Sequence, residues 1–380
     1  HPDTSAGYYS VYNNCRTKAE SLSAGIAFDL MEKYKARALG QLEDTDPYDC
    51  IFSATVKEEM RPAEKVAVGN LRTFIIGPIE HYLYQLKYCG TFNKTLVRLQ
   101  PDLASCVGAS KYRLGWHEMM ARLLEEDEDG SLIRAFLGVI DYSRYDTTIP
   151  HQALMEYCEL MIPYLRRDPK FDAVEEKIFR QTFLDMSVST VVMPDGHVWR
   201  KHGGLPSGVL VTSSIGTLHN FRCFVYAYLV LGRKKANYQD FKEDVFPLIF
   251  GDDNTYATRL LWFSPRNIAR VLHRDLNMEA TSPYPDFSPP TDVEFLSQHN
   301  FVHESGYYMP RPDGQKALDS LLWHPIEKDL VHETWLRVNG LRVEYRYTDE
   351  YQILDAFADE LQSSYEVDAR VRLSTMEIDD

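Results

Sequence analysis

Residues 244–261 read DVFPLIFGDDNTYATRLL, and this stretch decides the fold. Two runs rich in apolar and aromatic residues flank Gly251-Asp252-Asp253-Asn254, a pattern that predicts a strand, a tight turn and a second strand. Gly251 lets the turn bend without a Cβ clash. We expect Asp252 at the tip of this hairpin. Asp253 is the next residue on the strand and points mostly to the opposite side, so it is given a supporting role.

A second acidic segment lies upstream of this hairpin. The apolar run in SLIRAFLGVIDYS (131–143) predicts a buried strand that ends at Asp141, and Asp146 follows it. Carboxylate oxygens on rigid backbone are ligands that Mg²⁺ prefers. Two such ions roughly 3.5–4 Å apart stabilise both the attacking and the leaving oxygen of a phosphoryl displacement. A strand-end Asp141 that faces Asp252 would supply this bridge.

Two further segments carry small polar and basic residues. GGLPSGVLVT (203–212) is a glycine-rich turn that leads into a long apolar stretch at 209–231, which predicts a core helix. KEEMRPAEKVAVGNLR (57–72) interleaves bases with acids. Lys65 and Arg72 in this segment are candidates to clamp a triphosphate, arginine as a bidentate fork and lysine as a point charge. An ordinary charged hairpin is the competing interpretation.

The composition excludes several classes of protein. The chain has 380 residues, with 41 Lys+Arg against 56 Asp+Glu and a net charge of −15. No apolar run approaches the roughly 18 residues of a membrane span, and the first residues do not resemble a secretory signal. Six scattered cysteines without a CxxC pair predict buried thiols in a reducing compartment. The acidity argues only weakly against nucleic-acid binding, because a basic channel can lie inside an acidic shell.

Local patterns predict the remaining elements. We expect a helix at 151–165, a hairpin at 187–203 and a further strand or hairpin at 293–310. Residues 80–124 are expected to be helix and loop with breaks at Gly90 and at 101–108, and the last 70 residues to be helical and separate.

Taken together, these segments resemble the motifs of viral RNA-dependent RNA polymerases of the picornavirus-like group. The matching segments, from residue 3 to 301 in the family's order, are Thr4-Ser5-Ala6-Gly7-Tyr8 for motif G, 57–72 for motif F, DYSRYD (141–146) for motif A, GGLPSGVLVT for motif B, FGDDN (250–254) for motif C and Phe295-Leu296 for the start of motif E.

The resemblance implies an α+β right-hand polymerase fold, with an RRM-like antiparallel palm, fingers of helices and hairpins, and a small helical thumb. The expected domains are fingers 1–97 with motifs G and F, palm 98–178 with motif A, a fingers hairpin 179–204, palm 205–310 with motifs B, C, D and E, and thumb 311–380. A family member would also have a segment ahead of motif G, so we expect the chain to be cut there or to be a mature product with an unusual start.

The resemblance also implies a role for individual residues. The expected catalytic and metal-binding residues are Asp141, Asp252 and Asp253, with two Mg²⁺ ions for which Mn²⁺ could substitute. The expected nucleotide-binding residues are Lys65, Arg72, Asp146, Ser207 and Thr212, of which the last three test for the 2′-hydroxyl. The expected template or RNA contacts are Lys57, Arg61, Ser5, Gly7 and Gly208. Trp199, Arg200 and Lys201 of the 187–203 hairpin form a candidate template surface, with packing inside the fingers as the alternative.

The implied function is RNA-templated RNA synthesis, that is, nucleotidyl transfer to an RNA 3′-hydroxyl that replicates or transcribes a viral RNA genome. The expected partners are an RNA template, a primer or product strand, ribonucleoside triphosphates and other viral replication proteins, without direct membrane insertion. The expected location is the host cytoplasm in a viral replication complex, or a virion if the virus has a double-stranded RNA genome.

The sequence departs from the family pattern at several positions. Gly216 stands where motif B often has an asparagine that helps to recognise the 2′-hydroxyl, and Asn220 lies one helical turn further on, as in partitiviruses and picobirnaviruses. No lysine lies between Asp253 and Phe295 to serve as the motif D general acid, which leaves His273 or Arg274 as nearby candidates. Motif E has Ser297-Gln298-His299 in place of its usual bases, and motif G has Tyr9 where a proline is common.

Other functions therefore remain open. A reverse transcriptase shares a paired-aspartate hairpin tip, although the spacing of 57–72 and the Ser-Gly-x3-Thr pattern argue against it. A catalytically silent RNA-binding scaffold on a polymerase fold fits the missing motif D lysine and Gly216. A metal-independent hydrolase with paired carboxylates gives no reason for the basic segment.

Overall fold

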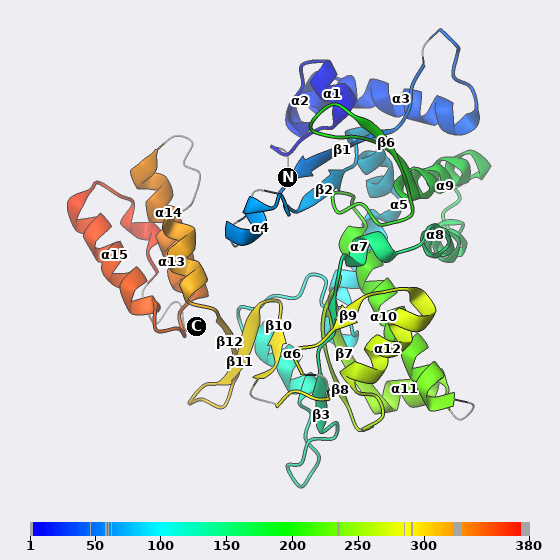
Figure 1. The fold of residues 1–380 in the computed structure, drawn as a ribbon. Helices are drawn as coiled ribbons and strands as arrows, with labels where there is room; N and C mark the ends of the chain where they lie inside the picture. The colour runs from blue at the N-terminus through cyan, green and yellow to red at the C-terminus, as the bar shows by residue number, and fades with distance from the viewer. Residues whose placement is uncertain are drawn as a thin grey trace.

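The computed structural model describes residues 3–45, 47–57, 59, 61, 63–233, 236–284, 286–289, 292–322 and 329–373. Figure 1 shows three regions along the chain: helices around one sheet at the blue N-terminal end, a second sheet flanked by helices, and a group of orange-to-red helices at the C-terminal end. We name these three regions fingers, palm and thumb, after the domains expected from the sequence.

The first region contains helices packed against one another through aromatic and aliphatic residues. They are α1 (Tyr8–Tyr12), α2 (Lys18–Ser23), α3 (Ile26–Leu39), α5 (Ile79–Arg98) and α9 (Ala173–Ser187). The start of α2 is a capping box, in which the Thr17 side chain accepts from the Glu20 N–H and the Glu20 side chain accepts from the Thr17 N–H. Helix α3 ends at Gly40, which has a left-handed φ of 70°.

A four-stranded sheet completes this region. Its order is β2 (Thr73–Ile76), β1 (Ile51–Val56), β5 (Val188–Val192) and β6 (Val198–His202), with β1 antiparallel to β2 and parallel to β5. The short helix α4 (Ala63–Ala67) lies between β1 and β2. Strands β5 and β6 pair antiparallel, so the predicted hairpin at 187–203 is confirmed.

A three-stranded antiparallel sheet lies at the centre of the palm. Its order is β3 (Phe136–Gly138), β8 (Asp253–Thr258) and β7 (Val245–Phe250). The last pair of the β7–β8 hairpin is Phe250 with Asp253, which leaves Gly251 and Asp252 as a two-residue turn, as the sequence predicts. Strand β4 (Asp141–Tyr142) pairs with β9 (Ala280–Thr281) beside this sheet.

Helices cover both faces of the palm sheet. Helix α10 (Thr212–Gly232) packs against β7 with α12 (Pro265–Leu276) beside it, and α6 (Gly115–Leu123) also contacts β7 and lies across the sheet from them (Figure 1). The remaining helices of this part are α7 (Tyr145–Thr148), α8 (His151–Leu165), α11 (Tyr238–Asp244) and the 3-10 turn Gln100–Asp102. The helix predicted at 151–165 is therefore confirmed.

The C-terminal region begins with a small sheet and ends in helices. The sheet has the order β10 (Glu294–Phe295), β11 (Gln298–Val302) and β12 (Tyr308–Pro312), and the helices are α13 (Gln315–Leu322), α14 (Leu330–Glu344), α15 (Tyr351–Ser364) and the 3-10 turn Ala369–Val371. Trp335, Val338 and Leu354 are fully buried in a core cluster that is separate from the palm and fingers clusters.

One predicted break is wrong. Helix α5 continues through Gly90, because the buried Tyr84, Tyr88 and Leu96 on either side hold it in place and outweigh the roughly 1 kcal/mol that a glycine costs a helix. The break predicted at 101–108 is confirmed, since α5 ends at Arg98 and no α-helix follows before α6 in this described stretch.

Candidate active site

Three of the predicted acidic residues line one cavity. Asp141 lies at the start of β4, Asp252 at the tip of the β7–β8 turn and Asp253 at the start of β8. The cavity has a volume of about 1100 Å³. Its lining residues are Arg72, Val139, Asp141, Asp252, Asp253, Thr281, Ser282, Pro283, Tyr284, Asp292, Glu294, Ser297 and His299. Asp253, expected to point away from the site, lines the same cavity as Asp252.

The carboxylates in this cavity raise one another's pKa. Burial raises the pKa of Asp141, and the charges of Asp252 and Glu294 raise it further. Burial and the charge of Asp252 raise the pKa of Asp253 to about 6, against a hydrogen bond from the Leu296 backbone N–H that lowers it. The site therefore holds more negative charge than its single lining arginine balances, which is the electrostatic setting that attracts cations.

Asn254 fixes the β7–β8 turn to the strand that carries Asp141. Its buried side chain donates to the Ile140 carbonyl oxygen (2.8 Å) and to the Asp252 carbonyl oxygen (2.9 Å), and accepts from the Ile140 N–H (3.1 Å). These bonds set the backbone of Asp252 relative to the residue that precedes Asp141. No local pattern indicates this role beyond the polar type of the residue.

Helix α10 holds the same turn from the other side. Asn220 donates to the carbonyl oxygens of Gly251 (3.0 Å) and Asp252 (3.1 Å) and accepts from the Tyr142 hydroxyl (2.9 Å). Thr217 accepts from the Gly251 N–H (2.8 Å). The Asn220 amide is thus used in holding the turn, and it does not replace the asparagine expected at position 216.

Gly216 lies directly against the turn. A Cβ atom built at Gly216 would be 3.4 Å from the Gly251 Cα, and the Gly216 carbonyl oxygen accepts from the Tyr145 hydroxyl (2.6 Å). Gly216 and Thr217 lie four and three residues before Asn220, so the three residues share one face of α10, which is the signal that the sequence offers for this contact.

The residues predicted to sense the ribose divide into two groups. Asp146 and Ser207 are together, since the Ser207 hydroxyl donates to the Asp146 carboxylate (2.8 Å). Burial raises the pKa of Asp146, whereas the Ser207 hydrogen bond lowers it. Thr212 differs, because its hydroxyl donates to the carbonyl oxygens of Pro206 (2.7 Å) and Val209 (2.9 Å) and closes the turn before α10.

Gly208 connects this turn to the fingers. Its N–H donates to the Ile75 carbonyl oxygen (2.8 Å) and its carbonyl oxygen accepts from the Gly77 N–H (3.4 Å). A Cβ atom at Gly208 would be 2.9 Å from the Ile75 carbonyl oxygen. The structure therefore gives Gly208, predicted as an RNA contact, a close backbone approach to β2.

Three of the four predicted basic residues of the 57–72 segment lie close to the carboxylate of Glu59. Glu59 lies 3.2 Å from the Lys57 ammonium, 3.6 Å from the Arg61 guanidinium and 3.3 Å from the Arg72 guanidinium. Arg72 also lines the acidic cavity. Lys65 is exposed on α4 and does not line this cavity. Glu59 was not predicted as a site residue, although the sequence shows an acid among the bases.

The turn between β10 and β11 reaches Asp253 in the acidic cavity. Leu296 and Ser297 have left-handed φ values of 52° and 56°, which leucine adopts only at a cost. In this conformation the Leu296 N–H bonds to Asp253. The segment that resembles motif E therefore supports the second aspartate through its backbone and not through basic side chains.

The N-terminal segment packs against the end of β2. The Gly7 N–H bonds to the Ser5 hydroxyl (3.3 Å), and the Ile79 N–H donates to the Ala6 carbonyl oxygen (3.0 Å). Gly7 has a φ of 91°, and a Cβ atom there would be 2.7 Å from the Pro78 Cα. The segment that resembles motif G therefore contacts Pro78 and Ile79, which join β2 to α5, and Ser5 is exposed.

The remaining candidates are Arg274, for the motif D acid, and the β5–β6 hairpin, for the template surface. Arg274, a candidate motif D acid, is exposed and forms a bidentate pair with Asp275 (2.5 and 2.6 Å). In the β5–β6 hairpin Trp199 and Arg200 are exposed, as a template surface requires. Lys201 turns inward and donates to backbone carbonyl oxygens, so packing is the correct interpretation for this residue.

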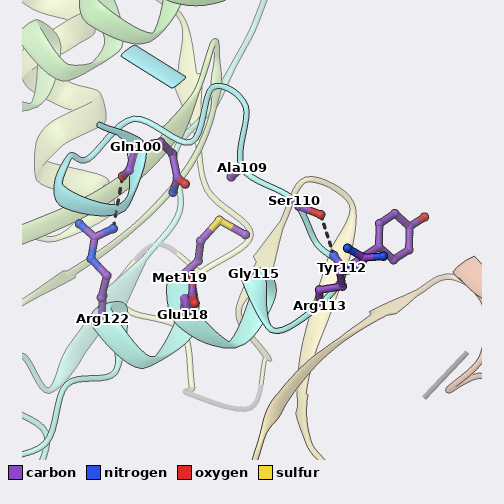
Figure 2. Close-up of a pocket in the computed structure, with 9 residues that line it drawn as sticks. All are labelled: Gln100, Ala109, Ser110, Tyr112, Arg113, Gly115, Glu118, Met119 and Arg122. Carbon is purple, nitrogen blue, oxygen red and sulfur yellow. Dashed lines mark hydrogen bonds between the residues drawn. The ribbon is translucent and has the colours of Figure 1, made fainter. Parts of the chain in front are cut away.

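A second cavity, of about 270 Å³, lies between residues 100–114 and α6 (Figure 2). Arg122 points to this loop and donates to the carbonyl oxygens of Gln100 (3.5 Å) and Leu103 (3.1 Å). None of the described residues lines both cavities. Arg122 thus holds the loop to α6, and we assign this cavity no part in the chemistry.

The described residues contain neither a compact group of metal-ligating side chains nor a membrane-spanning helix. No three His, Cys, Asp or Glu side chains among them are grouped so that they could hold a metal ion by themselves. No helix that they form combines the length and apolarity of a membrane span.

Residues 1–361 match the family described as viral RNA-dependent RNA polymerase. The chain belongs to this family. The polymerase is 24% identical over 305 residues to the RNA1 polyprotein of Tomato ringspot virus (isolate raspberry), a match that covers 78% of this chain and 13% of the polyprotein. It is 27% identical over 323 residues to the genome polyprotein of Encephalomyocarditis virus (strain emc-b nondiabetogenic), with 82% and 13% covered. It is 23% identical over 332 residues to that of Human parechovirus 2 (strain Williamson), with 84% and 14% covered.

Among solved structures, the polymerase is similar to the Sicinivirus 3Dpol RNA dependent RNA polymerase. The TM-score is 0.69 at 19% sequence identity, and the match covers 92% of this chain and 69% of the other. The predicted right-hand polymerase fold is confirmed by this similarity. The chain spans 13% to 14% of the length of the three polyproteins named above.

Proposed function

We propose that this polymerase adds ribonucleotides to an RNA 3′ end on an RNA template and releases pyrophosphate. The observation that carries the proposal is the convergence of Asp141, Asp252 and Arg72 on one cavity, from three segments far apart in the sequence. Carboxylates for cations on one side and a guanidinium for phosphates on the other are the groups that nucleotidyl transfer needs.

The donor atoms of the cavity fit Mg²⁺. Asp141 and Asp252 supply hard carboxylate oxygens, and burial together with the charges of Asp252 and Glu294 raises the pKa of Asp141, so that a bound cation would stabilise its charged form. Mg²⁺ is commonly held by one or two carboxylates together with substrate phosphates and water, so a larger protein cluster is not required. When bound there, two Mg²⁺ ions would activate the primer 3′-hydroxyl and neutralise the triphosphate, and Mn²⁺ could take their place.

The polymerase's own side chains bind and select the substrate. Arg72 is the described cation that lines the cavity, and it would neutralise the charge that develops on the triphosphate. Asp146 and Ser207 form the polar pair that would test for the 2′-hydroxyl. Lys65, Lys57 and Arg61 would contact phosphates of the nucleotide or of the RNA.

The partners follow from this chemistry. We propose an RNA template, a primer or product strand and ribonucleoside triphosphates as ligands. The relatives named above are polyproteins, which supports other viral replication proteins as partners in the host cytoplasm, or inside a virion for a double-stranded RNA virus. The exposed Trp199 and Arg200 are candidate template contacts, through stacking and charge.

The test is incorporation of labelled UMP on poly(A) primed with oligo(U), with Mg²⁺ and then with Mn²⁺. We expect incorporation by the wild type and a loss of at least about a thousandfold in Asp252→Asn, with an unchanged or higher melting temperature because one like charge is removed. Glu128→Gln, in the exposed acidic run 125–129, is the matched control and should keep wild-type incorporation. Equal incorporation by Asp252→Asn would overturn the proposal.

A catalytically silent RNA-binding scaffold is the second candidate function. One observation favours it: no lysine lies between Asp253 and Phe295, and Arg274 is paired with Asp275. A scaffold would bind primed template without metal-dependent incorporation. A reverse transcriptase would instead incorporate dTMP on the same template in preference to UMP, so both alternatives are separated in the same assay.

A further inference from the structure

Lys201 is half-buried at the base of the motif B turn. It is on β6, two residues before Gly203, where the turn at residues 203–208 begins. Its ammonium donates to the carbonyl oxygens of Gly203 (2.6 Å), Gly204 (2.5 Å) and Met186 (3.3 Å). One cation therefore joins the first two carbonyls of the turn to the end of α9.

The turn needs such a partner because of its backbone conformation. Gly203 and Gly204 have left-handed φ values of 76° and 75°. Their N–H groups donate to Ser187 and Ile149, which fixes one side of the peptide chain. Lys201 satisfies the carbonyl oxygens on the other side. A part-buried carbonyl left without a donor costs free energy, so the ammonium stabilises this conformation over others that glycine allows.

The same turn carries the residue that touches Asp146. The Leu205 N–H donates to the Asp146 carbonyl oxygen (2.8 Å), and two residues later the Ser207 hydroxyl donates to the Asp146 carboxylate (2.8 Å). A shift of the Gly203–Gly204 backbone would therefore move Ser207 relative to Asp146. Lys201 acts on this pair through the backbone and touches neither the reacting atoms nor the cavity lining.

We propose that Lys201 is a positioning residue that holds residues 203–208 in the conformation in which Ser207 contacts Asp146, and that it thereby sets the preference of the site for ribonucleotides over 2′-deoxyribonucleotides. The substrates in this inference rest on the proposed function, whereas the contacts of Lys201 do not.

Other features of the site make ribose recognition depend more strongly on the pair Asp146 and Ser207. Gly216 offers no side chain toward the ribose, and the Asn220 amide is bonded to the β7–β8 turn. The Thr212 hydroxyl is bonded to Pro206 and Val209. Of the predicted ribose-sensing residues, Asp146 and Ser207 are thus the two that contact each other directly, and their geometry depends on the turn that Lys201 anchors.

The role of the charge on Lys201 can be tested by changing the pH around the pKa of this residue. Burial lowers the pKa of Lys201 to about 8, and the charge of Asp146 acts in the opposite direction. The other charged or titratable groups around the turn are Arg72, which lowers the pKa of Asp146, and His151, whose ring bonds to the Ser187 hydroxyl. Arginine keeps its proton throughout this range, so Lys201→Arg separates the charge of residue 201 from its neighbours.

The experiment compares wild type, Lys201→Met and Lys201→Arg, with Lys177→Met on the exposed face of α9 as the matched control. The first measurement is the ratio of kcat/KM for UTP to that for 2′-dUTP. We expect a roughly tenfold loss of this ratio in Lys201→Met, a smaller loss in Lys201→Arg and no change in the control. The wild-type ratio should fall from about pH 7 to about pH 9, and the Lys201→Arg ratio should not.

The second measurement is hydrogen exchange of the 203–208 amides, which does not depend on activity. Lys201→Met should exchange these amides faster while the β7–β8 amides keep their wild-type rates. Wild-type exchange in Lys201→Met would overturn the inference, as would a wild-type UTP preference in an active Lys201→Met. If the wild type incorporates nothing, the proposed function fails, and the exchange rates still decide whether Lys201 holds the turn.

Discussion

The side chain of Asn254 makes three hydrogen bonds that cross between the segments carrying Asp141 and Asp252. Replacing it with alanine leaves the Ile140 N–H and carbonyl oxygen buried without partners. We expect Asn254→Ala to lower the free energy of unfolding by about 2–4 kcal/mol and to reduce incorporation strongly. Urea unfolding measures the first effect. Asn267→Ala, which removes two exposed bonds, one to the Trp262 carbonyl oxygen and one from the Arg270 guanidinium, should cost less than about 1 kcal/mol.

The second prediction for a single residue concerns Glu59, because its carboxylate neutralises basic side chains that are proposed to bind the substrate. Glu59→Gln keeps the shape and removes the charge, so Arg72 is free to bind phosphate. We expect the Kd for ATP to fall by about three- to tenfold at low ionic strength, and the difference to shrink as salt screens the charges. Equilibrium binding without RNA measures it. An unchanged or weaker Kd would show that Glu59 does not compete with the nucleotide.

At the scale of the elements, the motif B turn approaches the backbone of β2 closely. A Cβ atom at Gly208 would lie 2.9 Å from both the Ile75 carbonyl oxygen and the Ile76 Cα, and these are backbone atoms that cannot rotate away. Gly208→Ala should therefore destabilise the chain by about 1–3 kcal/mol and separate the turn from β2. Thermal denaturation is the measurement. Gly340→Ala is the control, because a Cβ there meets nothing within 4 Å and alanine should stabilise α14.

Elements with a strong local pattern could be predicted from the sequence. The β7–β8 hairpin, the β5–β6 hairpin and helix α8 are examples, because alternation, turn residues and helical spacing are encoded within a few residues. The joint position of Asp141 and Asp252 was also predicted, from their places at a strand end and a hairpin tip. Gly90 shows the limit of the local pattern, since tertiary packing keeps α5 continuous across it.

The supporting side chains could not be predicted, because their partners are distant in sequence. Asn254 bonds to a residue 114 positions away, and Asn220 to residues 31 and 32 positions away. Nothing in the local pattern around Lys201 indicates that it turns inward, because a β-strand offers two faces and the sequence does not say which one the fold buries. Glu59 is a mixed case, because Lys57 and Arg61 are two residues away from it whereas Arg72 reaches it only when β1 and β2 pair.

At the level of the whole molecule, the acidic cavity makes stability depend on pH. The folded chain holds the Asp253 proton up to a pKa of about 6, whereas the ordinary value is 3.8. Between these values the folded state binds the additional proton, so the contribution of Asp253 to stability falls as pH rises through this window. We expect the metal-free protein to lose part of its melting temperature from about pH 4 to about pH 6, and Asp253→Asn to lose less.

Added Mg²⁺ should raise the melting temperature in the pH range where loss of the Asp253 proton lowers it. Above about pH 6 Asp253 has released its proton and the cavity attracts a cation more strongly, so added Mg²⁺ should raise the melting temperature more at about pH 7.5 than at about pH 5. Incorporation should fall on the acid side over the same range. A Mg²⁺ effect that does not change with pH would contradict the assignment of these carboxylates as ligands.

The six cysteines can report where the folded chain opens locally. All are free and buried, and they lie at residues 15, 50, 89, 106, 158 and 223, which spreads them over the fingers and the palm and leaves the thumb without any. Burial raises the pKa of Cys89, Cys106 and Cys223 to about 12, so these thiols resist alkylation while the fold is closed. A brief pulse of an alkylating reagent, read by mass spectrometry, would therefore report which part of the fingers or palm has opened, site by site and without an added label.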